Sequence, residues 1–252
     1  MAYIFRVLGL SLLLCAATDV PAQEPAQANV RWYKGSYDYG VLENDTVRGT
    51  EDFTVTIHPD GSRTVDTVVD LRELGHQSNA TLRVDHNFRP IDAYSSFWRF
   101  GEYRGAARFW FEPDGNGNDI LNNSVFGPHG RATHAVVFPP RATLRLHPVI
   151  IEGWQAATYD PKGAQTQSFA LYNMVTTGET GVQGIGMYQD NDVAFLGTKE
   201  VSTPAGDFTA DHMTFYGGRY HIWLWGPDRI LVRYTVPSNG REYRLTRLEQ
   251  GP

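Results

Sequence analysis

From Arg31 to the C-terminus, the chain is a succession of short segments in which apolar and polar residues alternate, separated by Gly, Pro, Asn or Asp. Alternation with a period of two places successive side chains on opposite faces of an extended strand. Short connections rich in these turn residues favour hairpins between consecutive strands. The pattern therefore predicts a mainly β protein, built as an antiparallel curved sheet or half-open β-barrel.

The expected strands fall into two sets, separated by a segment of different character. Pro140–Asp160 has the weakest alternation, and we expect it to form a short helical or irregular cover over the sheet. No linker or sustained repeat interrupts residues 31–252, which indicates a single β half-barrel domain. The strands are expected near residues 31–42, 46–58, 63–73, 77–86, 91–100, 104–112, 120–126, 132–138, 166–176, 193–202, 207–216, 219–225, 229–236 and 241–249.

The N-terminal residues have the pattern of an export signal. The apolar run Val7–Ala17 is shorter than the ~20 residues that span a bilayer as a helix, but it suits the core of a signal peptide. The small residues Val20 and Ala22 predict cleavage after Ala22. We therefore expect a signal peptide (1–22), a polar lead-in (23–30) and a periplasmic or secreted domain with no stable membrane insertion after cleavage.

Composition and missing motifs exclude several classes of function. The only cysteine, Cys15, would leave with the signal, so the mature chain would have no disulfide, cysteine nucleophile or thiolate ligand. A net charge of -6 argues against a nucleic-acid partner. The sequence has neither a His-x-His or His-Glu-x-x-His metal motif nor a Gly-x-Ser-x-Gly elbow. We expect no metal and no cofactor.

Turn chemistry predicts the register of two hairpins. Around "HPDGSR", a loop with Gly61 at positive φ sets Val55 opposite Val65, so that the apolar residues of both strands share a face. A Gly217–Gly218 loop sets His212 opposite Trp223, and Thr214 opposite His221.

The second hairpin raises the question of which of its faces points inward. If the "GPDR" turn contains an even number of residues, His221 and Trp223 share a face with Tyr234. The opposite face of the last strands then carries charged residues. We therefore expect the polar-aromatic face to point inward as a ligand cavity, and Pro140–Asp160 to cover the apolar face. The polar-aromatic face consists of His212, Tyr216, Arg219, His221, Trp223, Trp225, Tyr234, Tyr243 and Leu245.

The densest aromatic stretch, Phe88–Phe111, offers a second wall for such a cavity. Tyr94, Trp98 and Phe100 alternate with other residues and so share one face of a strand. A large aromatic core without a cavity is the alternative interpretation.

Two stretches carry a family resemblance. They are "GTKEVSTPAGDFTADHMTFYGGRYHIWLWGPDRILVRYTV" (Gly197–Val236) and "VDHNFRPIDAY" (Val84–Tyr94). They resemble uncharacterised exported bacterial β-proteins that look related to the periplasmic lipoprotein carriers. This resemblance implies a half-open antiparallel barrel around a cover helix, with a cavity for acyl chains. The aromatic and histidine-rich face departs from that pattern, which leaves room for an aromatic, polycyclic or sugar-like ligand.

Three hypotheses follow from the sequence. In the first, the protein binds an amphipathic or aromatic small molecule, with His212, His221 and Arg219 at the polar end of the ligand. The apolar wall would then comprise Tyr94, Trp98, Phe100, Trp223, Trp225 and Tyr234. In the second, it is a cofactor-independent isomerase, lyase or hydratase, with His212 or His221 as base and Tyr216 as proton donor. In the third, it is a structural envelope protein with an aromatic core and no ligand.

Overall fold

A computed structural model describes residues 30–128, 130–175 and 184–252 of the chain. The described residues form one 15-stranded sheet with the order β8-β7-β6-β5-β4-β3-β2-β1-β15-β14-β13-β12-β11-β10-β9. Neighbouring strands are antiparallel, except for β9 and β10, which run parallel. The predicted mainly β, curved antiparallel sheet is confirmed, and the parallel pair is an addition that the sequence pattern did not indicate.

The strands are β1 Arg31–Val41, β2 Val47–Ile57, β3 Arg63–Leu71, β4 His76–Val84, β5 Pro90–Arg99, β6 Glu102–Pro113, β7 Asp119–Gly127, β8 Gly130–Phe138, β9 Thr143–Arg145, β10 Thr166–Met174, β11 Gly186–Thr203, β12 Gly206–Phe215, β13 Tyr220–Trp225, β14 Ile230–Val236 and β15 Arg241–Gly251. The helical elements are α1 Val149–Trp154 and the 3-10 turns Arg72–Leu74, Gln155–Thr158 and Pro237–Asn239.

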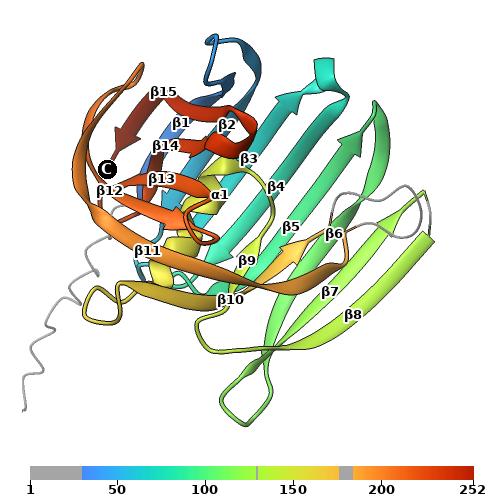
Figure 1. The fold of residues 1–252 in the computed structure, drawn as a ribbon. Coiled ribbons are helices and arrows are strands. Elements are labelled where there is room, and N and C mark those ends of the chain that lie inside the picture. The colour runs from blue at the N-terminus through green and yellow to red at the C-terminus, as the bar shows by residue number, and fades with distance from the viewer. Residues whose placement is uncertain (1–29, 129, 176–183) are drawn as a thin grey trace, which may run out of the picture.

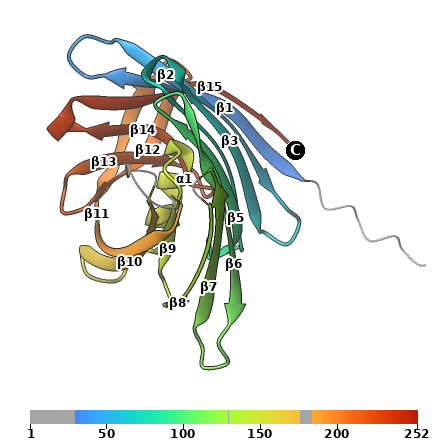
Figure 2. The same ribbon diagram turned by 90° about the vertical axis from the view of Figure 1, so that its right-hand side faces the viewer.

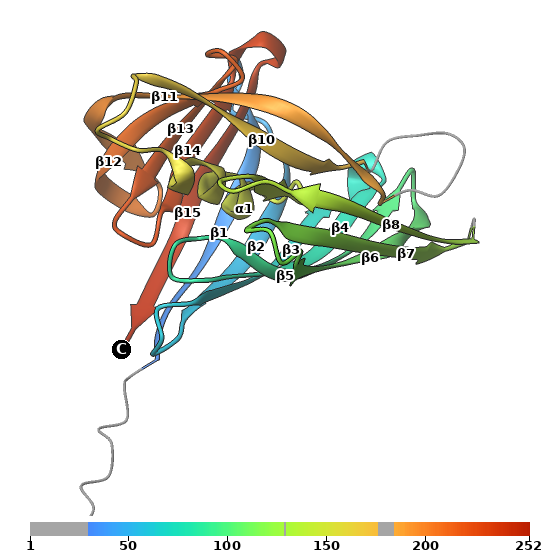
Figure 3. The ribbon, with the colours of Figure 1, turned by 90° about the horizontal axis from the view of Figure 1, so that it is seen from below.

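The sheet curls around α1 without closing into a barrel. Strands β1 to β8 form one wall and β10 to β14 the other, and α1 lies in the space between them (Figures 1 and 2). Seen from below, β6, β7 and β8 extend beyond the part of the sheet that surrounds the helix (Figure 3). The two ends of the sheet, β8 and β9, are not neighbours in the strand order.

The predicted cover segment is confirmed. Every residue of α1 is buried. A Cβ at Gly153 would lie 3.0 Å from Leu224 Cδ2 and 3.3 Å from Leu231 Cβ, so the helix backbone packs directly on β13 and β14. The face of β12 and β13 that carries Met213, Phe215, Ile222 and Leu224 is almost fully buried on this side. Burial of these apolar side chains holds the helix inside the curved sheet.

The two hairpin registers argued from turn chemistry are confirmed. Val55 pairs with Val65. His212 pairs with Trp223, and Thr214 with His221.

The prediction that the polar-aromatic face points inward is wrong. A register shift between Trp223 and Leu224 places Trp223 opposite Arg233, and Ile222 opposite Tyr234. Tyr234 therefore shares the helix-facing side with Ile222, while Trp223 lies on the other face of the sheet. One extra residue in β14 places Tyr234 on the opposite face of the sheet from the one predicted.

The last hairpin also differs in detail. An Asn239–Gly240 two-residue turn, as the sequence "SNGR" predicts, would align Val236 with Tyr243. In the structure Val236 pairs with Arg241 and Tyr234 with Tyr243, because the connection has four residues. Gly240 takes the left-handed conformation that ends this turn, at φ 64°. A change of two residues keeps every side chain on its face, so Tyr243 still points inward.

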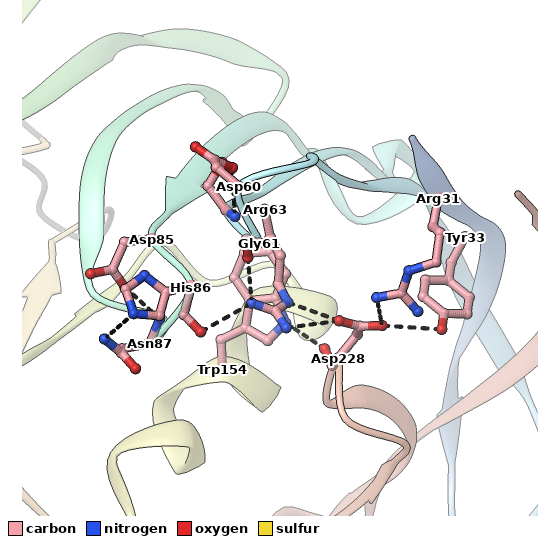
Figure 4. A network of polar contacts seen from close by, with 11 residues as sticks. Arg31, Tyr33, Asp60, Gly61, Arg63, Asp85, His86, Asn87, Trp154 and Asp228 are labelled. Carbon is pink, nitrogen blue, oxygen red and sulfur yellow. Dashed lines mark hydrogen bonds and ion pairs between the residues drawn. The ribbon is translucent and has the colours of Figure 1, made fainter. Parts of the chain in front are cut away.

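A buried carboxylate fastens the loop between β13 and β14 to the opposite wall of the sheet. Asp228 accepts hydrogen bonds from Arg63 Nε at 2.9 Å and from the Tyr33 hydroxyl at 3.1 Å. Arg31 lies 3.3 Å from the same carboxylate, and the Trp154 indole donates to the Asp228 carbonyl at 3.2 Å (Figure 4). The network joins β1, β3 and α1, and it compensates a charge that is only 1% exposed.

The proposed signal peptide and lead-in lie almost wholly outside the described residues. No helix within the described ranges has the length and apolar character needed to cross a membrane.

Candidate functional site

A cleft of about 430 Å³ opens at one end of the curved sheet, beside the start of α1. Its lining comes from strand ends that are far apart in the sequence and brought together by the sheet. The lining residues are Tyr39, Arg48, Leu71, Leu74, His76, Arg99, Phe100, Arg145, His147, Val149, Glu152, Tyr234, Arg241 and Tyr243.

Three arginines of the cleft have no acidic partner among the described residues. Arg48, Arg99 and Arg241 come from β2, β5 and β15, and no described carboxylate lies within ion-pair distance of any of them. The Nε of Arg48 is also buried without a hydrogen-bond partner in the described part of the chain. Guanidinium groups that line one cleft without a counter-charge are suited to bind an anion.

A fourth arginine is neutralised internally. Arg145 Nε donates to Glu152 Oε1 at 2.6 Å, and both side chains are largely buried. The other Glu152 oxygen accepts from Gln155 at 2.7 Å, and Asn191 donates to Gln155 at 3.2 Å. Because each charge has a partner and further hydrogen bonds, this pair forms a rigid side wall.

A second carboxylate lies behind the cleft and fixes its floor. Glu51 accepts hydrogen bonds from the Tyr39 hydroxyl at 2.5 Å and from Thr67 at 3.0 Å. It also accepts the backbone N–H groups of Val149 at 2.7 Å and Ile150 at 3.1 Å, at the start of α1. Burial raises the pKa of Glu51, although the four donors act in the opposite direction. The carboxylate thus joins the helix to β2 and aligns Tyr39 in the cleft.

Three tyrosines form an aromatic floor. Tyr39 and Tyr243 meet edge to face at 4.6 Å, and Tyr234 stacks on Tyr243 at 5.0 Å. Burial raises the pKa of all three phenols, so they remain neutral hydrogen-bond donors at physiological pH. Leu74 and Phe100 are 54% and 72% exposed at the rim, where an apolar part of a ligand would contact them.

Two histidines of the cleft remain neutral. Burial, followed by the charge of Arg145, lowers the pKa of His147 to about 4. The Nε2 of His147 lies 2.7 Å from the Met174 carbonyl, which only accepts, so Nε2 carries the proton and Nδ1 is a hydrogen-bond acceptor. Burial and the charge of Arg99 also lower the pKa of His76. His147 and Phe100 have positive φ values of 78° and 54°, and bulky residues adopt this conformation only where the surroundings enforce it.

The two predicted catalytic histidines do meet, but away from Tyr216. His212 Nε2 lies 3.0 Å from His221 Nδ1, and Trp223 stacks on His212 at 4.4 Å. Burial lowers the pKa of both histidines, that of His212 to about 4. The Tyr216 hydroxyl instead accepts from Arg145 at 3.2 Å and from Gln189 at 3.0 Å, on the helix side of the sheet. The structure therefore separates the proposed bases from the proposed donor.

The other predicted ligand-binding residues are scattered. Phe100 and Tyr234 line the cleft. Tyr94 is 42% exposed on the outer face of β5, where Phe97 takes the inward position instead. Three further residues lie outside the cleft: Trp98 packs on Tyr103 at 5.3 Å, Trp225 packs on Phe208 at 5.5 Å, and Arg219 is exposed at the β12–β13 turn.

The cleft arginines were not found from the sequence, although their positions carry a usable signal. Arg48 stands near the start of β2, Arg99 at the end of β5 and Arg241 at the start of β15. In an antiparallel meander these termini meet at the same end of the sheet. Arginines that recur at such termini would have pointed to this end.

Among the described residues, no group of three or more His, Cys, Asp or Glu side chains is placed to hold a metal ion.

Comparison with known proteins identifies a similar fold but no function. A solved structure of a beta-barrel-like protein of the domain of unknown function DUF1849, from Brucella abortus, superposes with a TM-score of 0.50 at 11% sequence identity. The match covers 88% of this chain and 98% of the Brucella chain. No protein-family model and no curated protein matches the sequence. The shared feature is therefore the fold of an uncharacterised β-barrel-like protein.

Proposed function

We propose that this chain is an exported binding protein that holds an amphipathic small molecule in the arginine-lined cleft. The observation that carries the proposal is the set of Arg48, Arg99 and Arg241, which surround a tyrosine floor without an acidic partner. Arg48 and Arg99 are half-buried, and a positive charge that is partly withdrawn from water is stabilised by a partner, which an anionic group of a ligand would supply. Export is supported by the signal-like residues 1–22.

The apolar part of the ligand would contact the rim and the aromatic floor. Leu71, Leu74 and Phe100 line the cleft together with Tyr234 and Tyr243. The cleft combines these apolar side chains with several polar groups, and small-molecule sites use such polar groups to orient a ligand. The resemblance to periplasmic lipoprotein carriers supports a ligand with an acyl chain, and the tyrosine floor also fits an aromatic ring.

The test is isothermal titration calorimetry with decanoate and decyl sulfate, two amphipathic anions below their micelle concentrations. We expect binding to the wild type and at least tenfold weaker binding to the Arg99→Gln/Arg241→Gln double variant. Arg219→Gln is the matched control, because it removes the same charge from an exposed turn. Equal affinities for the double variant and the control would refute the cleft as the site. No binding of either anion to the wild type would refute the function.

The enzyme hypothesis receives no support from the geometry, since Tyr216 and the histidine pair lie on opposite faces of the sheet. A binding protein requires no such pairing.

A further inference from the structure

The charges around the cleft define how much negative charge a ligand must bring. Arg48, Arg99 and Arg241 contribute three positive charges, and the ion pair of Arg145 with Glu152 contributes none. The nearby Asp70 is already paired with Arg72. The sum over the lining is therefore positive.

Two further acids lie near the lining: Glu73, which is exposed to solvent, and Glu51, one side chain behind the lining. The four neighbours of Glu51 (Tyr39, Thr67, Val149 and Ile150) all act as donors, which is the environment of an ionised carboxylate. With Glu51 ionised, the lining residues and Glu51 together carry a net positive charge of about two, and the charge of the exposed Glu73 is screened by water. His76 and His147 add none, because both are neutral at physiological pH.

We propose that the cleft selects a dianionic headgroup, of the kind found in a phosphate monoester, at the end of an apolar chain. This inference rests on the proposed function and specifies its ligand. A carboxylate or a sulfate ester brings one negative charge and leaves the cleft positive, whereas a phosphate monoester brings close to two above its second pKa of about 6. Its three terminal oxygens also match guanidinium groups that approach from three strands.

The groups that surround the headgroup come from several elements. Arg48 and Arg241 approach from the starts of β2 and β15. Burial raises the pKa of the Tyr243 phenol, and the positive charges of these two arginines act in the opposite direction. Arg99 approaches from β5 beside His76 of β4. From the helix side come the ion pair of Arg145 and Glu152 and the neutral His147. The Nδ1 acceptor of His147 can bind the hydroxyl of a singly protonated phosphate.

The experiment compares decyl phosphate with decyl sulfate, which have the same chain and a similar tetrahedral headgroup but differ in charge. Calorimetric titrations of the full mature protein at pH 8 should give at least tenfold tighter binding of decyl phosphate. At pH 5 decyl phosphate carries one charge, and the ratio of the two affinities should fall below threefold. Decyl sulfate does not titrate in this range, so protein groups that change with pH affect both ligands and largely cancel in the ratio.

Matched variants connect the selectivity to the cleft. Arg241→Gln removes one of the unpaired charges from an exposed position, so the fold should tolerate it. We expect the phosphate-to-sulfate ratio at pH 8 to decrease at least threefold in this variant and to remain unchanged in Arg219→Gln.

Each outcome is informative. If decyl sulfate binds and decyl phosphate binds no tighter at pH 8, the dianion inference is wrong and the proposed function stands. If neither binds, both are wrong. Inorganic phosphate separates a lipid-like source from a free anion: affinity equal to that of decyl phosphate would support the dianion site but contradict an amphipathic ligand. A ratio that is high at both pH values would show that charge is not the basis of selection and would overturn the inference.

Discussion

Replacement of Glu51 tests whether one carboxylate holds the cover helix in place. Glu51 is fully buried and accepts two hydroxyl and two backbone N–H donors. Glu51→Ala would leave the N–H groups of Val149 and Ile150 and the hydroxyls of Tyr39 and Thr67 without this acceptor. A buried donor without a partner costs about 1–3 kcal/mol.

The magnitude follows from these contacts. The two backbone donors cannot rotate toward water, so at ~1.5 kcal/mol each they account for about 3 kcal/mol. The lost packing and the two hydroxyl donors add to this loss, and removal of a buried charge offsets part of it. We expect a net loss of about 4–5 kcal/mol for Glu51→Ala. Glu51→Gln keeps one acceptor oxygen, and we expect a loss of about 2 kcal/mol.

The assay is urea denaturation followed by tryptophan fluorescence, to which Trp154 at the end of α1 contributes together with the other five tryptophans. Glu43→Gln, at an exposed position, serves as the control and should change stability by no more than about 0.5 kcal/mol. If Glu51→Ala is as stable as the control, the carboxylate does not anchor α1 and the reasoning fails.

Three further predictions concern the same frame. Because burial lowers the pKa of His147 to about 4, the unfolded chain binds a proton between pH 6.5 and 4 that the folded protein does not. The neutral His147 therefore costs no stability above pH 6.5, and the free energy of unfolding falls as the pH decreases toward 4. His147→Gln should flatten the acid side of the stability profile by up to about 3 kcal/mol, relative to the exposed His86→Gln, and an unchanged profile would contradict this. Gly153→Ala should destabilise by about 1–3 kcal/mol in thermal unfolding, because the new Cβ would lie 3.0 Å from Leu224; a neutral effect would show that α1 can move outward. Asp228→Asn should cost about 3–5 kcal/mol in urea denaturation, since it leaves Arg63 buried without its partner, and wild-type stability would show that the network is dispensable.

Much of the fold could be predicted from local chemistry. Alternation and turn residues gave the strands and the register of Val55 with Val65, because a period of two and a glycine turn fix pairing over a few residues. The cover at Pro140–Asp160 followed from an apolar strand face that needed burial. The extra residue opposite Trp223 had no such signal, since a bulge depends on the pairing of both strands.

The site was harder to predict from the sequence than the fold, for a physical reason. Arg241 lies at the same end of the sheet as Arg48 and Arg99 because β1 pairs with β15, a contact between the two ends of the domain. Turn chemistry fixes only consecutive strands, so it is silent on that pairing. Aromatic density instead drew attention to Trp223 and Tyr94, which face away from α1.

The most direct test of the arginine-lined cleft is photo-crosslinking with a diazirine analogue of decanoate, followed by peptide mass spectrometry. We expect the label to attach to the strand ends around Leu74, Phe100 and Tyr243, and excess decyl phosphate to prevent this labelling. Labelling centred on the His212–Trp223 face, or on the outer surface at Tyr94, would contradict the account and return the ligand to the face first indicated by the sequence.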